Sequence, residues 1–77
     1  MDEKRLLLCN LIRKLDKFTN VRIEALNCSV PLYYEGQLRK YYEFNYYGTF
    51  VDSVVKSIYV DERDYLCIGV TVPHFVG

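Results

Sequence analysis

The chain has 77 residues, the length of one small domain, so we expect a single domain over residues 1–77. Hydrophobic residues make up 51% of the chain and aromatic residues 16%, a composition that excludes a disordered protein. Ten basic and ten acidic side chains cancel, which argues against a protein that binds nucleic acid mainly through its phosphates.

The cysteines indicate a reducing compartment. There are three of them, an odd number without a C-x-x-C pair, which is unlike the disulfide framework of a small secreted protein. Leu6–Leu8 is too short for the apolar core of a secretory signal, and no run reaches the roughly eighteen apolar residues that span a bilayer. We therefore expect a cytoplasmic protein without membrane contact, in which Cys9, Cys28 and Cys67 pack as small hydrophobic side chains.

The first predicted element is a helix near the start of the chain. Apolar side chains recur there at spacings of three and four residues, at Leu8, Leu11, Ile12, Leu15 and Phe18. This spacing forms one apolar stripe along a helix. Asp2 can cap the helix, Glu3 favours its N-terminus, and Thr19-Asn20 ends the pattern. We expect the stripe to pack into the core.

Four segments have the composition or alternation of strands. Val21–Ala25 alternates apolar and polar residues, and Leu32–Glu35 follows Pro31, which favours the start or edge of a strand. Val54–Val60 is rich in Val, Ile and Tyr, and Tyr65–Val72 alternates again after a polar turn. The first two segments are expected to form one hairpin, and the last two a second hairpin.

Residues 37–53 follow no single pattern. Gln37–Tyr42 fits one or two helical turns, and Asn45 and Gly48 interrupt any longer helix. The apolar spacing from Phe50 to Ile58 also fits a helix, which is an alternative to the strand. The predicted fold class is α+β: one N-terminal helix packed on a four-stranded antiparallel sheet made of two hairpins, with a short helical or irregular Tyr-rich connector.

No pattern indicates chemistry, so we predict a non-enzymatic protein without a cofactor or metal. The glycines stand alone rather than in a phosphate-binding loop, and no cluster has the spacing of a zinc site. The acidic turn 61–64 lacks the ligand pattern of a calcium loop. Spacing alone leaves open a dyad of His74 with Cys67 or Cys9, although inert core cysteines are the favoured interpretation.

Tyrosines gather in the middle of the chain, with two basic residues among them. Tyr and Arg are over-represented where proteins bind one another. We therefore predict a binding surface formed by Tyr33, Arg39, Lys40, Tyr41, Tyr42, Tyr46 and Tyr47, centred on residues 37–50. The alternative is that these rings cover a small core. Adjacent strand residues point to opposite faces, so one of Tyr33 and Tyr34 should face the helix and the other outward.

Three short motifs follow one another in the order of the predicted elements: Val21-Arg22-Ile23, Tyr34-Glu35-Gly36 and the V-x-S-I-x-V pattern of residues 55–60. In this layout the chain resembles very small accessory proteins of phages and mobile elements of Gram-positive bacteria. Some of those proteins, anti-CRISPR proteins among them, inhibit host defence. The resemblance implies a phage-type protein that binds and inhibits or modulates a larger host protein, such as a CRISPR effector. It identifies no functional residues.

Two further expectations concern partners. The alternative function is the binding or sequestering of a nucleotide or nucleic acid by Tyr stacking, which steep salt dependence would reveal. A chain this short buries only about 60% of its unfolded surface, so we also expect a two-fold homodimer. Its joining edges are expected next to Pro31 or after Val72.

Overall fold

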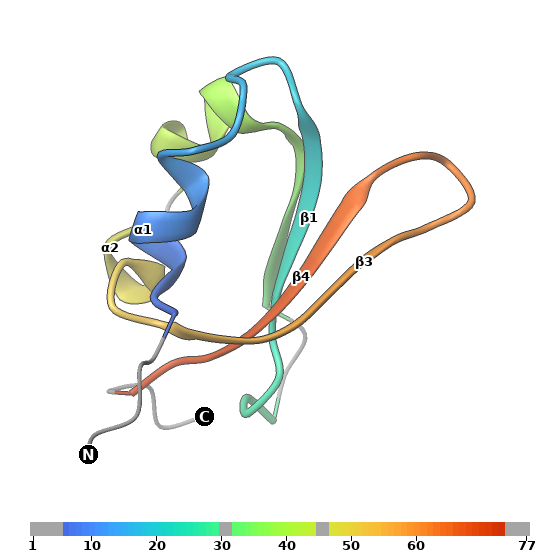
Figure 1. The fold of residues 1–77 in the computed structure, drawn as a ribbon. Helices are drawn as coiled ribbons and strands as arrows, with labels where there is room; N and C mark the ends of the chain where they lie inside the picture. Colours follow the sequence, from blue (N-terminus) through green and yellow to red (C-terminus); the bar gives the residue numbers. More distant parts are fainter. Residues whose placement is uncertain (1–5, 30–31, 45–46, 74–77) are drawn as a thin grey trace.

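The structure, a computed structural model, describes residues 6–29, 32–44 and 47–73. In chain order the elements are α1 (Leu8–Ile12), β1 (Asn20–Ala25), β2 (Tyr33–Gln37), the 3-10 helix η1 (Leu38–Glu43), α2 (Tyr47–Phe50), β3 (Val54–Val60) and β4 (Leu66–Thr71). The helical elements lie on one side of the sheet, and none of the described elements covers the other side (Figure 1). The α+β class is confirmed.

The sheet has the order β2-β1-β4-β3 and is mixed, so the prediction of a purely antiparallel sheet was wrong. The two predicted hairpins do form, because β1 pairs antiparallel with β2 and β3 with β4. The central strands β1 and β4, however, are parallel. The connector after β2 explains this: it crosses the helical side of the sheet, so β3 starts in the same direction as β2 (Figure 1).

The core lies between the helical elements and one face of the sheet. In β1 the alternation places Val21, Ile23 and Ala25 against the helices. The other buried hydrophobic side chains of the core come from every helical element, from β4, and from the positions just before β2 and just after β4: Leu8, Ile12, Leu32, Leu38, Tyr41, Phe50, Ile68, Val70 and Val72. These residues fix the position of the connector against the sheet.

The N-terminal helix is much shorter than its apolar stripe. Instead of reaching Phe18, α1 ends at Ile12. Beyond it the backbone makes hydrogen bonds between residues three apart, as in a 3-10 helix: Lys14 N donates to Leu11 O, and Leu15 N donates to Ile12 O. Ile12 is buried as expected and Leu11 and Leu15 are partly buried, but Phe18 is 54% exposed. A stripe with three-residue spacing fits tight turns as well as a helix. The predicted caps at Asp2 and Glu3 lie outside the described residues.

The connector and the last hairpin agree with the favoured predictions. Residues 38–43 form helical turns, and the segment from Val54 to Val60 is a strand rather than the alternative helix. The strand contains an irregularity at Lys56, since Val55 pairs with Val70 and Ser57 already with Gly69. Cys67 is buried as expected, Cys9 and Cys28 are partly buried, and all three are free.

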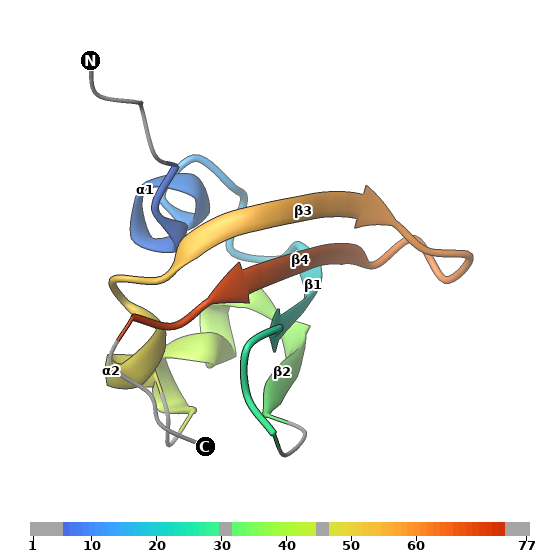
Figure 2. The ribbon, with the colours of Figure 1, turned by 90° about the horizontal axis from the view of Figure 1, so that it is seen from below.

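Val72, after which a joining edge was expected, already has its backbone groups bonded on one side, and residues 74–77 lie outside the described residues. β4 is an inner strand, and the Asn27 side chain bonds both backbone groups of Val72: its Nδ2 donates to Val72 O at 3.0 Å, and its Oδ1 accepts from Val72 N at 2.9 Å. Pro31 lies outside the described residues. The outer strand at this side of the sheet is β3, and α1 lies next to its beginning (Figure 2). No helix in the described part of the chain is long and apolar enough to cross a membrane.

Candidate binding surface

The 3-10 helix η1 divides the predicted binding residues into an inner and an outer set. Side chains three residues apart lie on the same side of a 3-10 helix. Leu38 and Tyr41 point inward and are buried, whereas Arg39, Lys40 and Tyr42 are exposed. Tyr41 is therefore corrected from a binding residue to a core residue.

Tyr41 is the centre of an aromatic cluster. Its ring makes edge contacts with Tyr34, Tyr42 and Tyr47 at centroid distances of 5.4, 5.8 and 5.1 Å. Burial raises the pKa of its hydroxyl, and the neighbouring tyrosines add to the rise. That hydroxyl has no hydrogen-bond partner among the described residues. The alternative interpretation of the tyrosines, a covering for the core, thus applies to Tyr41, and Tyr47 is itself half-buried.

The outer side of η1 meets the segment before β1. The amide of Arg39 donates to Lys17 O at 2.8 Å, which joins the two segments directly. The exposed ring of Phe18, in the segment before β1, lies near a cation from each segment, with Lys17 Nζ 5.4 Å and Arg39 Cζ 5.8 Å from its centroid. Tyr42, 51% exposed, follows one turn after Arg39. We call Lys17, Phe18, Arg39, Lys40 and Tyr42 the basic–aromatic surface.

The basic side chains of this surface have no ion-pair partners among the described residues. Segments 13–18 and 38–43 carry five basic and two acidic side chains, a net charge of +3. None of the five basic side chains forms an ion pair with a described residue, although Arg39 Nε donates to Gln37 Oε1 at 2.8 Å. The remaining described residues carry three basic and six acidic side chains, a net charge of −3. The chain is neutral as a whole but polarised.

Two arginines near the uncovered face of the sheet show the opposite arrangement, because both form ion pairs. Arg22 lies 3.2 Å from a Glu35 carboxylate oxygen, and Arg63 pairs with Glu35 and, at 2.9 Å, with Asp61. The Arg22 guanidinium also lies over the Tyr33 ring, with Cζ 4.0 Å from the centroid. The prediction that one of Tyr33 and Tyr34 faces outward is confirmed: Tyr33 is exposed, and Tyr34 packs against the core. The fold does not bring Tyr33 to the basic–aromatic surface.

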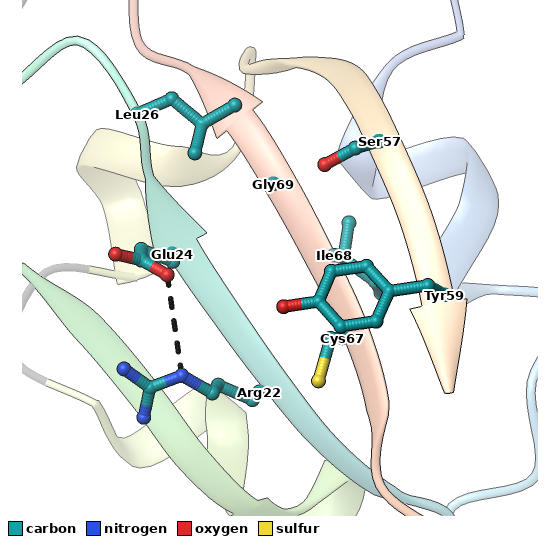
Figure 3. Close-up of a pocket in the computed structure, with 8 residues that line it drawn as sticks. All are labelled: Arg22, Glu24, Leu26, Ser57, Tyr59, Cys67, Ile68 and Gly69. Carbon is teal, nitrogen blue, oxygen red and sulfur yellow. Dashed lines mark ion pairs between the residues drawn. The ribbon is translucent and has the colours of Figure 1, made fainter. Parts of the chain in front are cut away.

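A small depression on the uncovered face is not a plausible ligand pocket. It lies over Gly69, between Leu26 and Ser57, with Tyr59 on one side and the Arg22–Glu24 ion pair on the other (Figure 3). Its volume is about 50 Å³, whereas ligand pockets usually hold roughly 300–1,000 Å³. Within the described ranges no group of three His, Cys, Asp or Glu side chains could hold a metal ion.

Of the seven predicted residues, Arg39, Lys40 and Tyr42 are thus exposed on η1, with Arg39 and Tyr42 on one side of it and Lys40 on the next. Tyr46 lies outside the described residues, as does His74 of the alternative dyad. Sequence reasoning missed Lys17 and Phe18, because Phe18 was assigned to a buried helical stripe. Comparisons with protein-family models, with curated proteins and with solved structures found no match.

Proposed function

We propose that the chain is a non-enzymatic protein that binds a larger protein through its basic–aromatic surface and blocks or modulates it. The observation that carries the proposal is the set of exposed cations around the exposed Phe18 ring, none of which forms an ion pair within the described part of the chain. An acidic surface on the partner would supply the missing counter-charges. Electrostatic complementarity of this kind guides association and selects partners.

The larger protein is proposed to be a host protein in the bacterial cytoplasm, of which a defence effector such as a CRISPR nuclease is the class that the sequence resemblance implies. Three free cysteines fit a reducing compartment. Occluding a surface of an effector needs no reactive group. It needs an anchor and matching charge, and the rings of Phe18 and Tyr42 beside Arg39 are side chains of the types that dominate such contacts.

Nucleic acid is the second candidate, since unpaired basic side chains beside exposed rings are also what a single strand requires. Two features favour the protein partner. The Phe18 ring already has two cations within 6 Å, which a stacked base would have to displace. The rest of the described chain is net acidic, with Asp61, Glu62 and Asp64 in one turn, and it would repel a longer phosphate backbone.

The test is capture from a Gram-positive host lysate with the parent chain and two matched variants. Arg39→Gln removes an unpaired charge, whereas Arg63→Gln removes the same charge where Glu35 and Asp61 already neutralise it. The partner should be recovered with the parent and with Arg63→Gln, and its recovery should fall with Arg39→Gln. Equal recovery with both variants would contradict the proposal.

A parallel assay separates the two candidates. Single-stranded oligonucleotides should show no mobility shift with the parent chain at low salt if the ligand is a protein. A shift that weakens steeply with salt, and weakens further in Arg39→Gln, would replace the protein partner with nucleic acid.

A further inference from the structure

The outer edge of β3 is only partly occupied. At the start of the strand, Leu7 bridges to Val54 and the Val55 amide donates to Leu6 O at 2.8 Å. From Lys56 to Val60 no described residue pairs with the outer edge of the strand. Along residues 56–60, the backbone groups that point away from β4 thus have no partner in the described part of the chain, which is the arrangement that recruits another strand.

The same five residues expose their large side chains on both faces. Ile58, Tyr59 and Val60 are 46%, 59% and 60% exposed. Figure 1 shows the cause: the outer half of the β3–β4 hairpin extends away from the helical elements, so nothing described covers either face. Proteins rarely leave a β-branched, aromatic edge strand open unless it is an interaction site.

We propose that this edge pairs with a second copy of the chain, in an antiparallel two-fold arrangement centred on Ile58. The pairing sets Ser57 opposite Tyr59 and Lys56 opposite Val60. The paired stretch is limited to the free segment 56–60, because Leu6–Leu8 occupies the edge before it and the turn after Val60 ends the strand. The two four-stranded sheets become one continuous eight-stranded sheet. This interface is separate from the basic–aromatic surface.

Charge favours a second copy over an unrelated strand. Lys56 and Glu62 are both exposed, and neither forms an ion pair with a described residue. The two-fold pairing brings Lys56 of one copy beside the Val60–Glu62 segment of the other, and symmetry repeats the contact. A segment whose unpaired charges complement each other across its own two-fold axis is suited to self-association.

The experiment is sedimentation of the full chain at high micromolar concentration. The parent should be a dimer, and Ile58→Lys should be a folded monomer, since Ile58 is exposed in the single chain and its loss leaves the core intact. Tyr42→Lys is the matched control: it adds the same charge at another half-exposed side chain and should stay dimeric.

A charge-exchange series keeps the test independent of any folding defect. Lys56→Glu and Glu62→Lys should each weaken the dimer by about tenfold, and the double variant should restore it. A monomeric parent, a dimeric Ile58→Lys or a double variant that does not recover would each overturn the proposal. The result is separate from that of the proposed function, which depends on Arg39.

Discussion

Replacing Tyr41 tests whether the middle of the connector belongs to the core. The Tyr41 side chain is fully buried, and its hydroxyl has no described hydrogen-bond partner. An unpartnered buried polar group costs about 1–3 kcal/mol, so Tyr41→Phe should raise the free energy of unfolding by up to that amount. Tyr41→Ala removes the ring between Tyr34 and Tyr47 and should lower it by about 3–5 kcal/mol.

Urea denaturation of the two variants measures both effects, and a thermal scan should show about 4–8 °C per kcal/mol for a domain of this size. Tyr42→Phe and Tyr42→Ala are the controls: Tyr42 is half exposed, so Tyr42→Phe should change stability little, and Tyr42→Ala, which loses ring contacts with Tyr41 and Tyr47, should cost clearly less than Tyr41→Ala. If Tyr41→Ala is as stable as the parent, Tyr41 is not a core residue. If Tyr41→Phe loses more than about 1 kcal/mol, its hydroxyl has a partner and the reasoning from burial fails.

Three further predictions concern the scaffold. Burial raises the pKa of Tyr41 above its ordinary 10.0, so the folded chain keeps a proton that the unfolded chain loses. Stability should therefore fall as the pH rises past about 10, and less steeply in Tyr41→Phe; equal slopes in urea melts would refute this. A Cβ on Gly69 would lie 2.5 Å from Ser57 Oγ and 2.9 Å from Leu26 Cδ1, and both of these exposed side chains can turn aside, so Gly69→Ala should cost no more than about 1 kcal/mol; a larger loss in urea melts would mean that the two side chains are held in place. Ile12→Ala should cost about 2–5 kcal/mol by calorimetry, and Leu15→Ala, only partly buried, should cost less; the reverse order would contradict the packing of α1.

Local patterns predicted the hairpins but not how they join. Alternation in Val21–Ala25 identified β1, and the Val-rich segment from Val54 identified β3, because each pattern reflects one strand with a buried face or strong β propensity. The parallel pairing of β1 with β4 depends on the route of the connector over the sheet. Local propensity contains no information about that route, since it is set by which distant side chains share the core.

The candidate surface was partly predictable for a similar reason. Arg39, Lys40 and Tyr42 were expected because of their residue types, and the three-residue period of a 3-10 helix would have assigned Tyr41 to the side of Leu38. Phe18 was assigned to a helix that ends before it. Its exposure follows from the contact between Lys17 and Arg39, which no local pattern predicts because it joins segments on either side of the first hairpin.

The most direct test of the basic–aromatic surface is a hydrogen-exchange map of the chain in complex with the protein that it captures. Binding should slow exchange at backbone amides in segments 13–18 and 38–43. The backbone amides of β1, of β4 and of the turn at 61–64 should exchange as in the free chain. Protection confined to β1 and β4, with none in segments 13–18 and 38–43, would contradict the account.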